Sequence, residues 1–180
     1  MSIETANLLL RPYSPEQLLA LIDDVEQFEE IIGLAAANGL RDFIRSDDVS
    51  PAWLARLRAS SIPDPWIHGF AVVHREDRLV IGMAAFKGPP DDAGEVEIAY
   101  GIVPDYEGRG YATEAAAALV AFASRNDDVK RVRAHTLPAT NASTRVLTKC
   151  GFEWIGEVMD PEDGLVWRWE LLPYNESSSL

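Results

Sequence analysis

The sequence contains one cysteine, Cys150, and only three histidines, which lie far apart in the chain. One cysteine cannot form an internal disulfide, and neither residue type is spaced like a set of metal ligands, so we expect no disulfide framework and no metal site. No apolar run approaches the ~20 residues that a membrane-spanning helix needs, and the N-terminal residues lack the pattern of a signal peptide. These absences predict a cytoplasmic protein that does not bind membranes.

Basic residues are also scarce. Lys and Arg total 16 against 29 Asp and Glu, so the net charge at pH 7 is −13. Nucleic-acid binding and docking on an anionic membrane both need a basic surface, so both kinds of partner are disfavoured. The acidic balance fits cationic partners, and it fits simple solubility equally well.

The length of 180 residues fits one domain, which we predict over 1–174, followed by a disordered serine-rich tail over 175–180. Periodicity and end signals predict four helices, over 15–32, 51–60, 111–125 and 141–150. They predict seven strands, over 7–13, 67–74, 79–87, 94–103, 131–136, 152–158 and 165–172. Residues 34–49 give no clear pattern. This order indicates an α/β (α+β) fold, a mixed sheet with helices packed on it rather than a doubly wound fold.

A glycine-rich segment, residues 104–114, joins a predicted strand to the alanine-rich helix. Amide hydrogens at a helix N-terminus form an anion site, and Gly108 and Gly110 would let the backbone approach a phosphate closely. The segment lacks the lysine of a nucleotide-hydrolase phosphate loop, and Thr113 stands where a dinucleotide fingerprint has its third glycine. The alternative is that this segment binds no ligand and is only a turn between the strand and the helix.

Three segments are informative together: EGRGYA at 107–112, EIAYGI at 97–102 and NASTRVLTKCGF at 141–152. They resemble motifs of the GCN5-related N-acetyltransferases (the GNAT family), in particular the RimJ/RimL-like branch. The first resembles the family's coenzyme A loop, the second resembles the strand before it, and the third resembles a helix signature of the branch. The resemblance implies a mostly antiparallel, seven-stranded sheet flanked by four helices, with a split between strands 4 and 5.

The resemblance also implies acetyl-CoA as the cofactor and coenzyme A as the product. The pantetheine arm would pair with the backbone of Ile102 and Val103 as an added strand does, and Asn141 would contact it. The residues implied to hold the pyrophosphate are Gly108, Arg109, Gly110, Tyr111, Ala112 and Thr113. Glu107 departs from the Gln or Arg that usually begins this loop, and it places negative charge near the phosphates.

The charge distribution supports an anionic ligand independently of the resemblance. The window 109–149 holds seven basic and three acidic residues, a net charge of +4, and the remainder holds nine basic and 26 acidic residues, a net charge of −17. The positive charge therefore falls in the segment expected to hold the cofactor. A basic surface without a ligand is the alternative.

The implied chemistry is transfer of acetyl from the thioester to a primary amine by direct attack. Glu97 is the candidate general base, with Glu95 on the same strand face as the alternative. Ser143 is the candidate proton donor to the leaving thiolate, with Tyr100 and Tyr111 as alternatives. The alternative for Glu97 and Glu95 is that they are solvated strand residues without a catalytic role. The alternative for Ser143 is that its hydroxyl only caps the helix.

Two function classes follow. The first is an acetyl-CoA-dependent N-acetyltransferase acting on a small amine or a peptide N-terminus. The second is a non-catalytic acyl-CoA-binding or protein-interaction module of the same fold, which the departure at Glu107 motivates. A nucleotide-binding oxidoreductase is a distant third. The sequence leaves the acceptor and the oligomeric state open, including a homodimer.

Overall fold

The computed structural model describes residues 1–45 and 49–172. Its strands are β1 (Ile3–Glu4), β2 (Leu8–Pro12), β3 (Ala35–Ala36), β4 (Phe70–His74), β5 (Leu79–Phe86), β6 (Glu95–Ile102), β7 (Arg131–Thr136), β8 (Glu153–Asp160) and β9 (Gly164–Leu171). Its helices are α1 (Pro15–Asp23), α2 (Val25–Ile32), α3 (Asp42–Arg45), α4 (Pro51–Ala59), α5 (Pro65–His68), α6 (Tyr111–Ala123) and α7 (Ala142–Lys149), with a 3-10 turn η1 (Pro104–Tyr106).

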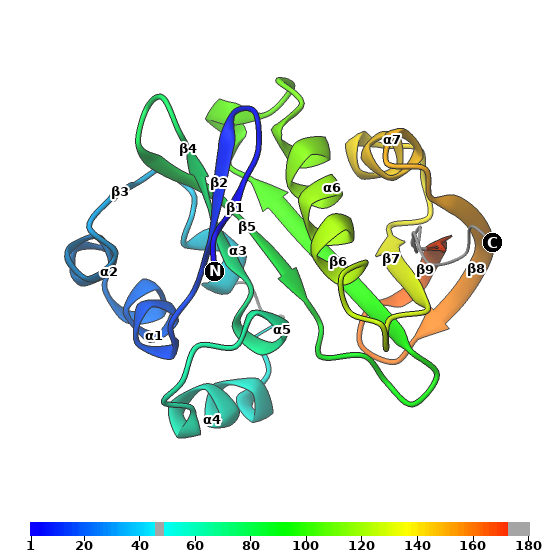
Figure 1. Ribbon diagram of the computed structural model, residues 1–180, viewed down its shortest axis with the longest axis horizontal. Helices are drawn as coiled ribbons and strands as arrows, with labels where there is room; N and C mark the ends of the chain where they lie inside the picture. The colour runs from blue at the N-terminus through cyan, green and yellow to red at the C-terminus, as the bar shows by residue number, and fades with distance from the viewer. Residues whose placement is uncertain (46–48, 173–180) are drawn as a thin grey trace.

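The nine strands form one sheet in the order β1-β2-β4-β5-β6-β7-β9-β8, with β3 beside β5 (Figure 1). Every pairing is antiparallel except β3–β5 and β6–β7. The predicted fold class, a mixed and mostly antiparallel sheet with helices, is therefore confirmed. The described residues hold nine strands and seven α-helices, against the seven and four expected.

Capping explains most of the extra elements. The helix expected over 15–32 is two helices, because the Asp24 carboxylate accepts from the amides of Glu26 and Gln27 and so begins α2. The strand expected from residue 67 begins later, because Asp64 caps the short α5, which ends at Gly69 with φ 68°. The segment 34–49 contributes β3 and α3, and its residues 46–48 lie outside the described residues, as does the expected tail over 175–180.

The sheet opens between β6 and β7. These two strands pair only through Glu95–Glu97 and Arg131–Arg133, at the start of each strand. Beyond these residues β6 keeps its other neighbour, β5, as far as the pair Gly82 and Ile102. This opening is the predicted split between the fourth and fifth expected strands.

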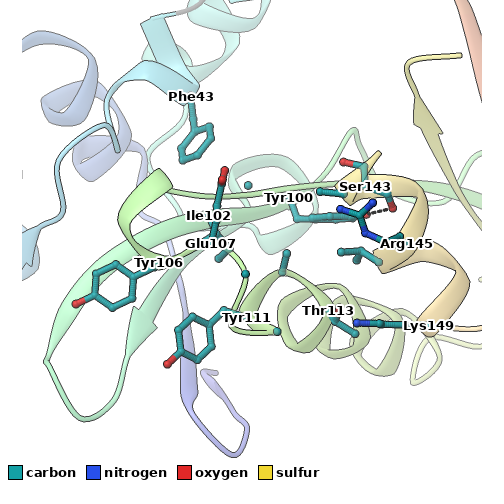
Figure 2. A pocket seen from close by; sticks show the side chains of 16 residues that line it. Phe43, Tyr100, Ile102, Tyr106, Glu107, Tyr111, Thr113, Ser143, Arg145 and Lys149 are labelled. Atoms are coloured by element: carbon teal, nitrogen blue, oxygen red, sulfur yellow. Dashed lines mark hydrogen bonds between the residues drawn. The ribbon is translucent and has the colours of Figure 1, made fainter. Parts of the chain in front are cut away.

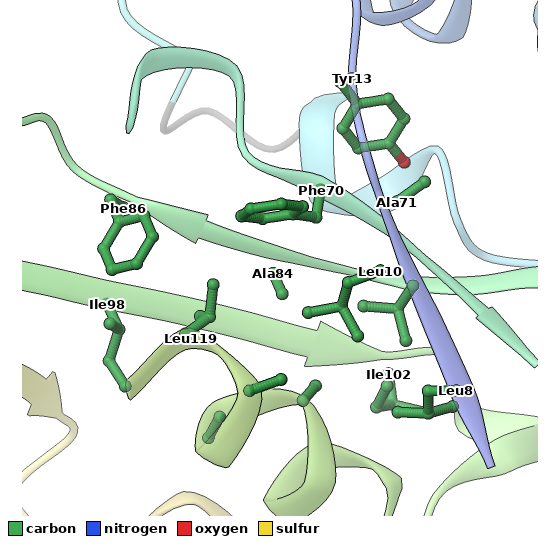
Figure 3. Close-up of a cluster of buried hydrophobic side chains, with 14 of the residues drawn as sticks. Leu8, Leu10, Tyr13, Phe70, Ala71, Ala84, Phe86, Ile98, Ile102 and Leu119 are labelled. Carbon is green, nitrogen blue, oxygen red and sulfur yellow. The ribbon is translucent and has the colours of Figure 1, made fainter. Parts of the chain in front are cut away.

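Part of the core lies between α6 and the sheet, and the same buried cluster includes residues of α1, α2 and α4. Alanines on α6, among them Ala115 and Ala116, are fully buried, and their small side chains let the helix approach β5 and β6 closely. Leu119 of α6 and Ile98 of β6 belong to the same buried cluster (Figure 3). This packing fixes the N-terminus of α6 at the end of β6, where the sheet splits.

Within residues 1–45 and 49–172, no helix is both long and apolar enough to cross a membrane. In the same ranges, no three His, Cys, Asp or Glu side chains are grouped so that they could hold a metal ion.

Candidate active site

A cavity of about 600 Å³ lies where β6 ends and α6 begins (Figure 2). Four segments line it. They are α3 with Phe43, β6 with Tyr100, Gly101 and Ile102, the loop and first turn of α6 with 106–108 and 110–113, and α7 with 142, 143, 145, 146 and 149. The cavity is therefore bounded by β6, which is one of the two strands of the split, and by α3, α6 and α7.

The glycine loop and the first turn of α6 form one wall of this cavity. Gly108 and Gly110 have φ values of 73° and 85°, a conformation that residues with a Cβ adopt only with strain. Gly110 is the N-cap of α6 and carries no side chain that could cap the helix. The first-turn amides have no acceptor within the helix, so those of Tyr111, Ala112 and Thr113 are available to an anion at the cavity wall.

Two tyrosines tie this loop to the turn between β4 and β5. The Tyr106 hydroxyl donates to Asp77 Oδ2 at 2.6 Å, and the Tyr111 oxygen lies 2.9 Å from His74 Nε2. The hydrogen bond to Asp77 raises the pKa of Tyr106. One tyrosine precedes the glycines and the other follows them, so the loop is held at both ends.

Arg109, at the centre of the loop, does not line the cavity. Its guanidinium carbon lies 5.2 Å from the centre of the Tyr106 ring, and its Nη2 donates to the Asp105 carbonyl at 3.1 Å. These contacts hold its charge beside the loop rather than inside the cavity.

Helix α7 supplies polar and cationic groups. Asn141 is its N-cap and accepts from the Thr144 amide at 3.0 Å, so the Asn141 side chain is used in the cap and Ser143 is not the cap. Ser143 is exposed and lines the cavity, and its carbonyl accepts from the Tyr100 hydroxyl at 3.5 Å. Burial raises the pKa of Tyr100 above its ordinary value.

Arg145 and Lys149 also line the cavity, one helical turn apart on α7. Sequence reasoning counted both in the basic window but did not name them as site residues. Their spacing of four residues on a predicted helix was a usable signal, because such residues share one face. Together they bring two positive charges to the same cavity as the first turn of α6.

The two carboxylates of β6, Glu95 and Glu97, lie outside the cavity. Glu97 does not line the cavity, and its Oε1 lies 2.8 Å from Lys87 Nζ and 3.0 Å from His135 Nδ1. Arg133 Nε lies 3.7 Å from its other oxygen. Burial alone would lower the pKa of Lys87, but the hydrogen bond and charge of Glu97 raise it. Glu97 therefore has cationic neighbours on several sides.

Glu95 is bound in a similar way, to Arg131 at 3.0 Å, to Arg168 at 3.3 Å and to Arg133. Side chains alternate along a strand, so Glu95 and Glu97 share a face with Gly101, whereas Tyr100 and Ile102 point to the face covered by α6 and α7. The two candidate bases thus lie on the sheet face opposite α6.

The structure brings most of the sequence-predicted binding residues together. Those that line the cavity are Ile102, Gly108, Gly110, Tyr111, Ala112 and Thr113, and the candidate catalytic residue Ser143 lines it with them. Val103 does not line it, is fully buried, and uses both backbone groups within the protein, donating to Ile81 at 2.9 Å and accepting from Tyr106 at 3.0 Å. Sequence reasoning missed Phe43, Tyr106, Arg145, Val146 and Lys149 as site residues.

The acetyltransferase (GNAT) domain model matches residues 7–153 of this chain. The chain belongs to the GNAT acetyltransferase family. The uncharacterized N-acetyltransferase YjdG of Bacillus subtilis (strain 168) is 30% identical over 89 residues, which are 49% of this chain and 51% of that protein. The chain spans about half the length of the curated relatives it matches.

Solved structures match the GNAT chain over nearly its whole length at low identity. The ribosomal-protein-S5-alanine acetyltransferase of Vibrio fischeri is 14% identical, with a TM-score of 0.64 over 96% of this chain and 97% of that one. The RimL ribosomal L7/L12 alpha-N-protein acetyltransferase in complex with coenzyme A is 15% identical, with a TM-score of 0.64 over 96% of this chain and 98% of that one. The family and fold indicated by the three motifs are confirmed.

Proposed function

We propose that the protein transfers an acetyl group from acetyl-CoA to a primary amine. One observation carries the proposal: left-handed glycines at 108 and 110 open the first-turn amides of α6 toward a cavity that Arg145 and Lys149 also line. Amides, guanidinium and ammonium are the donors that phosphates prefer, so these residues fit the cofactor's phosphates. The coenzyme A complex of a protein with the same fold supports the choice.

Bound acetyl-CoA would supply a thioester whose carbonyl carbon accepts the amine nitrogen, with coenzyme A leaving. Ser143 lines the cavity, so its hydroxyl would protonate the leaving thiolate. Tyr100 would assist by holding the Ser143 carbonyl and the first turn of α7 in place. The β6 backbone beyond Glu97, which β7 does not pair, would bond to the pantetheine arm.

The acceptor amine must lose a proton before it attacks, which for a lysine-like amine of pKa near 10.4 costs roughly 4–5 kcal/mol at pH 7. We propose Glu97 as the group that takes this proton, through water or through His135, because its face of the sheet is the one opposite the phosphate loop. An acceptor would then approach from that face and meet the thioester in the split.

The acceptor that we propose is a small amine or a peptide N-terminus. Two proteins of the same fold are named as acetyltransferases of ribosomal proteins, which supports the peptide. The acidic remainder of the chain, at −17, favours a cationic acceptor in either case. A cytoplasmic location and a homodimer stay predictions.

The non-catalytic alternative is favoured by one observation, the engagement of Glu97 by Lys87 and His135 outside the cavity. A thiol-release assay with acetyl-CoA and a panel of small amines and peptides separates the two functions. Turnover above background with any amine supports the enzyme. Calorimetric binding of acetyl-CoA without turnover on any amine supports the module.

A further inference from the structure

The phenyl ring of Phe43 closes the cavity on one side. It comes from α3, lines the cavity together with Gly101 and Ile102, and is 39% exposed (Figure 2). A partly exposed aromatic wall inside a cavity is a surface that an apolar part of a ligand can contact.

Gly101 makes room for this ring. A Cβ at position 101 would lie 2.7 Å from Phe43 Cε1 and 3.1 Å from two further ring carbons. The backbone of Gly101 is outside the left-handed region, so its conformation does not require glycine. The absence of a side chain at Gly101 therefore allows the Phe43 ring to pack directly against the backbone of β6.

Phe43 and the phosphate-binding wall lie on opposite faces of the sheet. Ile98 and Ile102, at even positions of β6, are buried toward α6. Successive side chains of a strand point to opposite faces, so position 101 faces away from α6. The same cavity is lined by Phe43 on one face and by Thr113 of α6 on the other. It therefore passes from one face to the other at the end of β6, beside the split.

We infer that Phe43 limits the length of the acyl group that the enzyme transfers. The inference rests on the proposed function, in which the phosphates bind at the N-terminus of α6 and the thioester lies in the split between β6 and β7. An acyl group emerging on the Gly101 face meets the Phe43 ring, which leaves room for acetyl and obstructs longer chains. Phe43 is thus a specificity-determining residue for the acyl donor.

The test compares acetyl-, butyryl- and hexanoyl-CoA as donors for the wild type, Phe43→Ala and Phe43→Leu. Rejection of one or two methylenes by a pocket wall is worth roughly 10–200-fold in kcat/KM. We therefore expect Phe43→Ala to raise the butyryl-to-acetyl ratio of kcat/KM by roughly 10-fold or more, with Phe43→Leu between it and the wild type. Ile67→Ala is the matched control, because Ile67 is 41% exposed and does not line the cavity.

An unchanged ratio in a folded Phe43→Ala protein overturns the inference, as does a wild type that uses hexanoyl-CoA as well as acetyl-CoA. A raised KM for the amine with an unchanged donor ratio also overturns it and assigns Phe43 to the acceptor. If Phe43→Ala does not fold, Phe43→Leu decides. If no thioester supports turnover, the proposed function fails, and calorimetric affinities for the three thioesters still test whether Phe43 restricts chain length.

Discussion

The Glu114 carboxylate, in the first turn of α6, accepts a hydrogen bond from the Asn7 amide at 2.7 Å. The Asn7 side chain donates to its second oxygen at 2.9 Å, and Thr5 and Leu8 donate as well. One side chain therefore ties α6, the helix that follows the glycine loop, to the turn between β1 and β2. Burial alone would raise the pKa of Glu114, but the hydrogen bonds from Thr5 and Asn7 lower it.

Glu114→Gln should lower the free energy of unfolding at pH 7 by about 1–2 kcal/mol, because the amide nitrogen cannot accept these bonds. The folded-state pKa lies below the unfolded value, so this contribution is present above roughly pH 4.3 and is lost as the pH falls through the folded-state pKa. Urea unfolding of both proteins at pH 7 and in acid measures it. A difference that does not shrink in acid would contradict the pKa argument.

Gly110→Ala should weaken coenzyme A binding. The φ of 85° costs a residue with a Cβ roughly 1–2 kcal/mol, and relief of that strain would move the first-turn amides of α6. Gly164→Ala is the matched control, since Gly164 has a φ of 74° and, like Gly110, no atom within 4 Å of an added Cβ. Both variants should lose similar stability, and only Gly110→Ala should lose affinity in calorimetry. Equal affinities would remove the loop from the binding site.

Arg145→Gln and Lys149→Gln should each weaken coenzyme A binding by roughly 5–10-fold at low salt, and by less at high salt, because the lost interaction is between charges. Arg58→Gln is the control, since Arg58 is a basic, exposed residue of α4 away from the cavity. Calorimetric titrations at two salt concentrations measure the effect. A loss that does not depend on salt would point to packing instead of charge.

Tyr106→Phe should raise the KM for acetyl-CoA roughly 5-fold, because about 1 kcal/mol of hydrogen bonding to Asp77 no longer holds the loop. The kcat should change little, since the hydroxyl is bonded away from the reacting groups. Tyr13→Phe is the control. The Tyr13 hydroxyl is buried without a partner among the described residues, so its removal should leave KM unchanged and keep or raise stability.

Glu97→Gln should lower kcat and change its pH dependence if Glu97 takes the proton from the amine. Glu95→Gln is the matched control on the same strand face, because Glu95 is bonded to Arg131 and Arg168. It should reduce stability with a smaller effect on kcat. Equal rates for Glu97→Gln and the wild type would remove Glu97 as the base.

The sequence predicted the later part of the fold well, because its signals there are local. β7 was predicted residue for residue, and α6 to within two residues, since alanine content and the glycine loop define it. The early part was predicted less well. The side chain of Asp24 divides one amphipathic pattern into two helices, and the short β3 exists through its pairing with β5, which no local pattern reports.

The candidate site shows the same division. The loop, Ile102 and Ser143 could be predicted because they lie in motifs that are contiguous in sequence. Phe43 could not, since it reaches the cavity only through contact with Gly101, 58 positions later in the numbering. The engagement of Glu97 also depends on partners from β5 and β7, Lys87 and His135, which sequence spacing does not connect.

The opening between β6 and β7 has a consequence for the solubility of the chain. The side of β6 that faces β7 forms a strand edge inside the sheet beyond Glu97, and such an edge is a template for any extended polypeptide. Amide protons along it should exchange with solvent faster than those of the paired residues Glu95–Glu97. An extended ligand bound in the opening would cover this edge, so the pantetheine arm, in the place proposed for it, would also protect the protein from aggregation.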